Sequence, residues 1–192
     1  MRARNTASLA VLLALALPAV AAGPVPRASP ELTIVDSAGH AVSLSSFKGQ
    51  VVVLEFLLVR CARCLRTAQT VNKLYGELAE AGFRPIGVAF DDGIGEPAIR
   101  ALADLLEINY LVGYTTSDKV DSYLGRAMTE RFQVPQVVVI DRAGVIRAQS
   151  RPTGEVDLTD EGYLRNLIRD LLNEGEPPGR TEKMTYSPGP AR

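Results

Sequence analysis

The sequence has very few of the residues that build metal sites. Its 192 residues include two cysteines, one histidine and no tryptophan. A zinc site with four protein ligands would have to combine Cys61, Cys64, His40 and a carboxylate from separate parts of the chain. We therefore expect no metal, and we interpret His40, which stands in a turn signal, as a solvated residue.

A charge imbalance is also absent. The chain has 21 basic and 22 acidic residues, and its first 22 residues contain Arg2 and Arg4 but no acid, so the remainder carries 19 against 22, or −3. A chain without basic excess is not expected to bind nucleic acid or an anionic membrane surface. Hydrophobic residues make up 46% and charged residues 22%, which excludes a fully disordered chain and a multi-span membrane protein.

The N-terminus has the three regions of a secretory signal peptide, which we place at residues 1–22. A basic start precedes an apolar run over 9–17 and small residues over 19–23. The alternative is an uncleaved membrane anchor, but residues 7–22 are fewer than the ~20 that a transmembrane helix needs. A lipoprotein would need a cysteine at the cleavage point, and the first cysteine is Cys61. We expect a periplasmic or otherwise extracytoplasmic protein, soluble after cleavage.

The remaining chain predicts one folded domain over 31–173. Residues 23–30 hold three prolines and form an extended lead-in, and residues 174–192 hold four prolines and three glycines and form a disordered tail. No internal repeat is present.

Hydrophobic patterns within the domain predict alternating strands and helices. The run 51–58 is apolar and β-branched enough to be a central strand buried on both faces. Apolar residues then recur at helical spacing over 65–79, and Gly82 ends that helix. The other expected strands are a hairpin over 32–35 and 41–44, then 84–90, 110–116, and a second hairpin over 136–141 and 145–149. Three further helices are expected: one with Pro97 in its first turn, one over 117–124 and one over 159–173. In the helix that contains Pro97, the residues expected to face inward are Ile99, Leu102, Leu105 and Leu106. This order predicts an α/β sandwich with a mixed sheet.

The motif Cys61-Ala62-Arg63-Cys64 falls where the buried strand gives way to the long helix. The first thiol would face the free amides and the positive end of the helix dipole, and Arg60 and Arg63 add positive charge beside it. Cys61 is therefore the candidate attacking thiolate and Cys64 the resolving thiol, with Ala62 leaving the pair uncovered. The alternative is a purely structural disulfide, but so short a ring constrains little unfolded chain.

The chain resembles exported thioredoxin-like proteins of the TlpA/ResA type, within the redoxin (AhpC/TSA) group. The resemblance covers 31–173 and rests on segments 44–49 and 51–56, on the cysteine motif, and on Val134-Pro135 before 136–144. It implies a thioredoxin-like three-layer α/β/α sandwich with a mixed central sheet and an N-terminal β-hairpin. It also implies that Pro135 is a cis-proline facing the cysteines and that the Val134 backbone pairs with an extended substrate segment.

Glu55 lies on the strand expected to be buried, where a carboxylate is unfavourable without a partner or a task. Its position matches the buried acid of thioredoxins, where a desolvated carboxyl could take the proton from Cys64. The alternative is an acid that points to solvent or pairs with an arginine.

Two positions depart from the family pattern. Arg60 replaces the tryptophan that usually precedes the first cysteine, and the usual Gly-x-Pro-Thr element reads Gln133-Val134-Pro135-Gln136. Arg60 and Arg63, with Ala62 and Val134, form the expected substrate surface. Two readings of Arg60 stay open: selection for an acidic partner, and an ordinary solvated loop residue.

Three other functional classes share parts of this sequence pattern. Peroxiredoxins need a threonine three residues before the peroxidatic cysteine and a nearby proline, but Leu58 stands there and no proline lies between Lys48 and Cys64. Copper-delivering relatives use a longer cysteine spacing and a later histidine. A non-catalytic binding module with a structural disulfide also stays open.

The expected activity is reduction of protein disulfides. Exported oxidases of the DsbA type carry a large helical insertion, and the ~20 residues between Asp91 and Val112 allow one helix. In the family, a reductase takes electrons from a membrane thiol donor and passes them to oxidised exported proteins such as apocytochrome c. We expect a monomer that needs no cofactor, because the electrons reside in the thiols.

Overall fold

The computed structural model describes residues 25–126, 133–150 and 157–174. The segment predicted as a signal peptide and the predicted tail beyond residue 174 lie outside the described residues. The strands are β1 Arg27–Ala28, β2 Thr33–Asp36, β3 Ala41–Ser43, β4 Val51–Leu57, β5 Phe83–Ala89, β6 Leu111–Tyr114, β7 Gln136–Ile140 and β8 Val145–Gln149. The helices are α1 Ala62–Leu78, α2 Glu96–Leu105, α3 Ser117–Leu124 and α4 Glu161–Asn173, with short 3₁₀ turns at Leu44–Phe47 (η1) and Ala79–Ala81 (η2).

All eight strands form one mixed sheet in the order β1-β8-β7-β4-β5-β6-β2-β3. The apolar run beginning at Val51 forms the central strand β4, and each of its seven residues is buried. It pairs in parallel with β5 and antiparallel with β7. A strand with neighbours on both edges and helices over both faces is expected to be largely apolar, and in β4 every residue except Glu55 is apolar.

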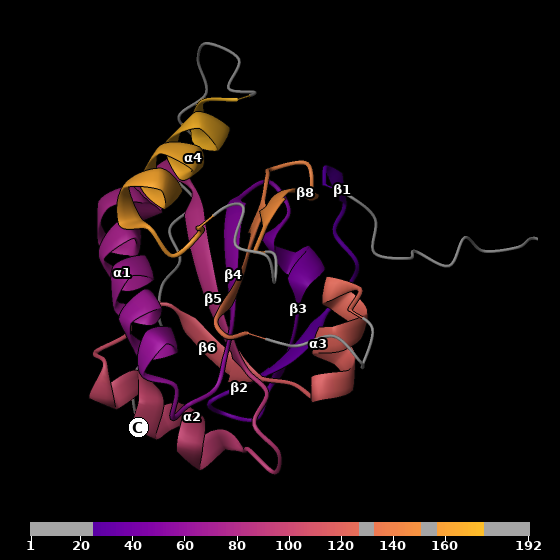
Figure 1. Cartoon of the computed structure of the whole chain (residues 1–192), viewed down its shortest axis with the longest axis vertical. Coiled ribbons are helices and arrows are strands. Elements are labelled where there is room, and N and C mark those ends of the chain that lie inside the picture. The colour runs from indigo at the N-terminus through magenta and orange to yellow at the C-terminus, as the bar shows by residue number, and fades with distance from the viewer. Residues whose placement is uncertain (1–24, 127–132, 151–156, 175–192) are drawn as a thin grey trace, which may run out of the picture.

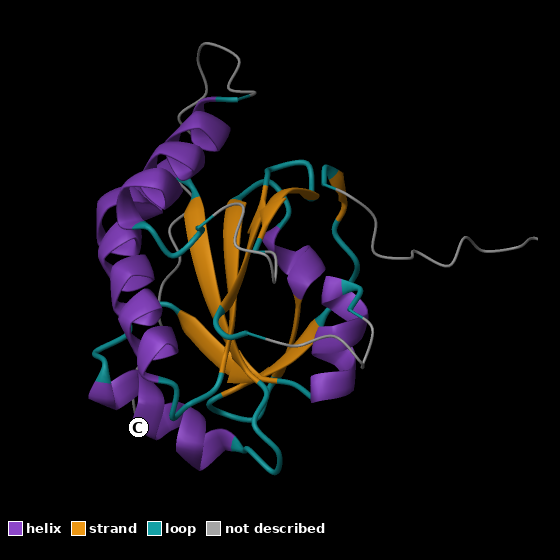
Figure 2. Ribbon diagram, in the orientation of Figure 1, coloured by secondary structure: helices purple, strands orange, loops and turns teal. Residues whose placement is uncertain are grey.

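Helices cover both faces of the sheet, so the predicted α/β/α sandwich is confirmed (Figures 1 and 2). Alternate residues of β4 separate the core into two sides. Val52, Leu54 and Phe56 pack with α3 on one side. Val53 packs with α1 and α4 on the other side, where Leu57 packs with α2 and the start of α1.

Ion pairs join α4 to α1 along this second face. Lys73 of α1 contacts Glu161 of α4 at 2.7 Å, and Arg165 of α4 contacts Glu77 at 3.0 Å. The Asp160 side chain accepts a hydrogen bond from the Tyr163 amide at 2.7 Å and so caps the start of α4. The last helix thus lies against the helix that carries the cysteine motif.

Part of the predicted lead-in adds a strand to the sheet. β1 pairs antiparallel with β8, and the Arg27 guanidinium donates to the Tyr123 carbonyl at 3.3 Å and to Gln149 Oε1 at 2.8 Å. Ser29 Oγ and the Tyr123 hydroxyl share a further hydrogen bond at 2.8 Å. These contacts with distant residues hold a segment whose prolines had indicated only an extended chain.

One predicted core residue is wrong. Leu105, expected to face inward, is 72% exposed, whereas Ile99 and Leu102 of the same helix are buried. Leu106, directly after the helix, packs against the same core group as Ile99 and Leu102, so the inward stripe continues through Leu106 and Leu105 lies outside it. Within the described residues, no helix is both long and apolar enough to cross a membrane.

Candidate active site

The cysteine motif stands at the junction between β4 and α1. After β4 ends, the Cys61 amide donates to the Leu58 carbonyl at 3.0 Å, which closes a tight turn. Cys61 is the N-cap of α1, with extended backbone angles, and its sulfur accepts a hydrogen bond from the Cys64 amide at 3.2 Å. The first sulfur therefore occupies the place of a helix-capping oxygen, where an anion is favoured.

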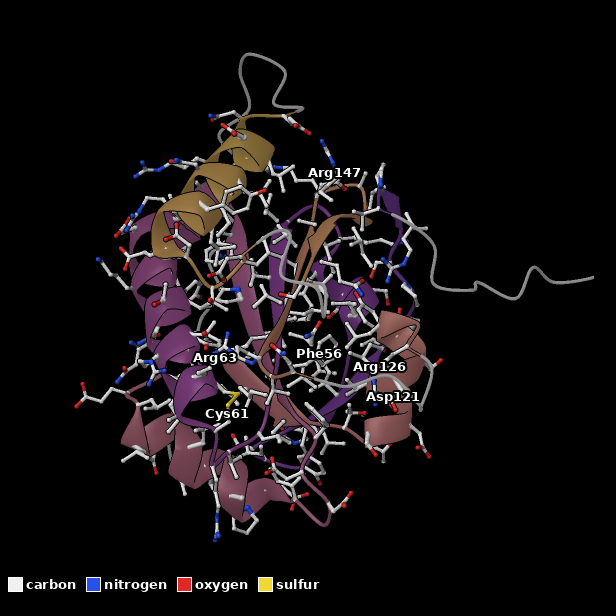
Figure 3. All side chains as sticks on the ribbon, viewed as in Figure 1. Phe56, Cys61, Arg63, Asp121, Arg126 and Arg147 are labelled. Carbon is white, nitrogen blue, oxygen red and sulfur yellow. A yellow bond between two sulfur atoms is a disulfide. The ribbon has the colours of Figure 1, made fainter. Side chains whose placement is uncertain are left out.

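The two cysteines form a disulfide and differ in exposure. Their Cα atoms are 5.2 Å apart, within the range that a disulfide spans. Cys61 is half-buried, whereas Cys64 is fully buried with Leu57, Ile99 and Leu102. Figure 3 shows the sulfur atoms at the end of α1 nearest α2. An incoming disulfide can thus reach Cys61 but not Cys64.

The Val134–Pro135 segment lies against the cysteines, as the resemblance implied. The Val134–Pro135 peptide bond is cis, and Pro135 is buried. Val134 packs against the core group that includes Cys61, and the Cys61 sulfur lies 4.0 Å from the Val134 carbonyl oxygen. The structure thus brings together the cysteines and the Val134–Pro135 segment from 70 residues away. Pairing of the Val134 backbone with a substrate stays a prediction.

Glu55 lies on the side of the sheet that holds the cysteines. Among the described residues, its carboxyl has no hydrogen-bond partner. It is 1% exposed, and both carboxyl oxygens lack a partner there. Val53 and Leu57, two positions to either side, pack on the α1 face, and Leu57 belongs to the core group of Cys64. Burial raises the pKa of the Glu55 carboxyl well above 4.5. The solvated or arginine-paired alternative is therefore wrong.

The charge of the Glu55 carboxyl also affects the pKa of Tyr110. Its hydroxyl donates to the Ala68 carbonyl of α1 at 3.4 Å. Burial first, and then the charge of Glu55, raise the pKa of Tyr110 well above 10. The hydroxyl is therefore a neutral group in the same buried region, and hydrophobic periodicity gave no indication of this relation.

Asp91 is a site residue that the sequence did not single out. Its carboxylate accepts a hydrogen bond from the Val59 amide at 3.0 Å, in the loop that leads to Cys61. One signal was available: Asp91 directly follows the strand parallel to β4, so both strands end at the same edge of the sheet. Asp91 thus connects the two loops at this edge.

The predicted substrate surface is exposed. Arg60, Ala62 and Arg63 are all exposed around the half-buried Cys61. Figure 3 shows Arg63 beside the sulfur atoms. The remaining member, Val134, is half-buried and packs against the core group that includes Cys61. Whether these residues contact a substrate stays a prediction.

Comparison with solved structures identifies the fold. The chain is similar to a candidate protein disulfide isomerase from Bacteroides thetaiotaomicron, with a TM-score of 0.65 and 27% identity over 79% of this chain and 92% of that one. It is also similar to a thiol:disulfide interchange protein of the thioredoxin family from Chlorobium tepidum, with a TM-score of 0.63, 20% identity, and coverage of 79% and 99%. The sandwich is therefore thioredoxin-like, as the resemblance implied.

Sequence comparison gives the family. The chain is 30% identical over 154 residues to the chloroplastic peroxiredoxin Q of Suaeda salsa, covering 72% of this chain and 66% of that relative, just under two thirds of its length. The model of the AhpC/TSA family matches residues 25–149, which hold the cysteine pair, Glu55 and Pro135. This protein, with its thioredoxin-like fold and its Cys61–Cys64 disulfide, therefore belongs to the AhpC/TSA family.

Proposed function

We propose that this protein is an exported thiol–disulfide oxidoreductase that reduces disulfides in other exported proteins. The observation that carries the proposal is the unequal environment of the pair: Cys61 is half-exposed at a helix N-cap, and Cys64 is fully buried on the side of the sheet that holds Glu55. A disulfide that only secures the fold does not need one accessible sulfur at the positive end of a helix. Export rests on the signal-peptide pattern of residues 1–22.

The reaction requires only the two thiols. In the reduced protein, the Cys61 thiolate attacks one sulfur of the substrate disulfide, which forms a mixed disulfide and releases one substrate thiolate. Cys64 then loses its proton and attacks the Cys61 sulfur, which restores the Cys61–Cys64 disulfide and releases the second substrate thiolate. Two electrons pass from the protein dithiol to the substrate, and both substrate thiolates take up protons.

Glu55 supplies a base for the second step. A buried thiol such as Cys64 is a poor nucleophile until it loses its proton. Glu55 lies on the same face of the sheet, and its raised pKa makes the ionised carboxylate a stronger base for the Cys64 proton. In this role Glu55 accepts the Cys64 proton, directly or through a water, and passes it to solvent.

The size of the insertion between β5 and β6 supports a reductase. This insertion holds one helix, α2, of ten residues, whereas the exported oxidases considered above carry a large helical insertion. We therefore assign a reductase, with electrons from a membrane thiol donor and an oxidised exported protein such as apocytochrome c as substrate.

The reduction potential of the pair tests this proposal. The chain from residue 23 onward is equilibrated in glutathione and dithiothreitol buffers, and its free thiols are counted. A value near that of thioredoxin, about −270 mV, supports a reductase, and one near −120 mV indicates an oxidase. A pair that resists reduction below about −300 mV would leave a binding module with a structural disulfide.

Cysteine variants test the assigned roles. Cys61→Ser should abolish reduction of insulin disulfides, because the attacking thiolate is lost. Cys64→Ser should accumulate mixed disulfides that non-reducing gels and mass spectrometry detect, because resolution is blocked. Full insulin reduction by Cys61→Ser would overturn the assignment.

A second candidate function is thiol peroxidase activity, which the similarity to peroxiredoxin Q favours. Leu58 and the absence of proline between residues 48 and 64 count against it, because peroxide would lack its usual cradle. Consumption of hydrogen peroxide by the reduced protein at a rate comparable to its disulfide reduction would support the peroxidase instead.

A further inference from the structure

The sequence around the cysteines has an unusual charge pattern. Between Glu55 and Glu77 there is no acidic residue, whereas the same stretch contains Arg60, Arg63 and Arg66. The first turn of α1 likewise has no acid. Acidic side chains are the ones that the positive end of a helix favours, so cations here are unfavourable for the helix itself. Helix stability therefore does not account for this arrangement.

The three arginines are exposed and lie within seven consecutive residues that include both cysteines. Arg63 and Arg66 are three positions apart on α1 and so are neighbours on its surface, away from the buried Cys64. Arg60 directly precedes Cys61. We name Arg60, Arg63 and Arg66 the arginine rim.

Nearby acids neutralise this rim only in part. The pKa of Asp157 is lowered by hydrogen bonds from Thr159 and, more weakly, by the charge of Arg63. Asp91 is held by the Val59 amide. Within the described part of the chain, no arginine of the rim forms an ion pair. The rim therefore has positive charge left for a partner, although the protein as a whole is acidic.

We propose that the arginine rim selects polypeptide substrates whose disulfide cysteine is flanked by acidic residues. This inference rests on the proposed function and names its substrate class. An extended segment beside Cys61 advances about 3.3 Å per residue, so acids two to four positions from the reacting cysteine can reach the exposed guanidinium groups. Opposite charges at this distance raise the encounter rate and fix the orientation of the substrate.

The chemistry is the exchange already described and needs no further reagent when the protein is reduced beforehand. The peptide disulfide gains two electrons and two protons, and the protein dithiol becomes the Cys61–Cys64 disulfide. The rim changes neither the bonds formed nor the bonds broken. It changes the rate at which the mixed disulfide with Cys61 forms.

Two synthetic peptides test the proposal. Both are closed by one disulfide and differ only in the four residues that flank one cysteine, which are glutamate in one peptide and lysine in the other. The reduced protein is mixed with each peptide in single-turnover experiments at about 20 mM and about 1 M NaCl. We expect the acidic peptide to react at least about tenfold faster at low salt. The ratio should fall below about twofold at high salt, where the screening length is ~3 Å.

Charge-reversal variants locate the effect. The double variant Arg60→Glu/Arg63→Glu should bring the ratio to one or below. Using a ratio removes any change in the intrinsic reactivity of Cys61, because both peptides meet the same thiolate. Lys48→Glu is the control: Lys48 is exposed just before β4, at the end of that strand opposite to Cys61, and should retain the full preference.

The possible results separate the two proposals. Equal rates for the two peptides at low salt, or a preference that survives in the double variant, would overturn the arginine rim and leave the reductase intact. Failure of the wild-type protein to reduce either peptide, while dithiothreitol reduces both, would overturn the reductase and the rim together.

Discussion

Substituting Glu55 by glutamine tests whether its carboxyl is truly desolvated. Burial raises the pKa of the carboxyl in the folded protein above 4.5, whereas the unfolded chain ionises normally. Above pH 4.5 the unfolded state has lost this proton and the folded state still holds it. The unfolded state then binds fewer protons, so the free energy of unfolding falls as pH rises.

The magnitude follows from linkage. Each pH unit between the unfolded and folded pKa values lowers the stability of the wild-type protein by about 1.4 kcal/mol. Above the folded pKa the loss stops growing. Glutamine has the same shape and does not titrate, so Glu55→Gln should become more stable relative to wild type with each step above pH 4.5.

Urea unfolding of the oxidised protein between pH 4 and pH 8 measures this difference, because the disulfide keeps both cysteines from titrating. Glu77→Gln is the control: Glu77 is on α1, and Arg165 lowers its pKa. Its contribution is therefore lost only as pH falls below 4.5, and its offset from wild type should stay constant from pH 5 to pH 8. A constant offset for Glu55→Gln over that range as well would refute a desolvated carboxyl.

Three further predictions concern the scaffold. Gly113→Ala should lower the free energy of unfolding by about 1–3 kcal/mol in urea titrations, because the new Cβ would clash with the Val35 carbonyl oxygen of the neighbouring strand. Gly76→Ala, on the exposed side of α1 with no atom within 4 Å of the new Cβ, should instead add about 0.5–1 kcal/mol, and a loss there would contradict the helix assignment. Burial raises the pKa of Tyr123 to about 12, so Tyr123→Phe should remove a late step from the ultraviolet tyrosinate titration; an unchanged titration above pH 11 would show that this hydroxyl is accessible.

The sequence by itself determined the elements whose signal is local. The β4 segment, apolar except for Glu55, predicts a strand buried on both faces, and the three- and four-residue spacing after Cys64 predicts α1. These two predictions together place the cysteine motif at the junction between β4 and α1. The buried position of Glu55 was predictable for the same reason, because it lies within the β4 segment.

Only the tertiary structure decided which distant groups meet. The order of strands places β7 beside β4, and this pairing brings the Val134–Pro135 segment to Cys61. The parallel pairing of β5 with β4 places the Asp91 carboxylate at the Val59 amide. The docking of Arg27 on Tyr123 and Gln149 likewise depends on residues about 100 positions away. Periodicity reports only the surroundings of a residue within its own element, so contacts between elements depend on the sheet order that packing selects.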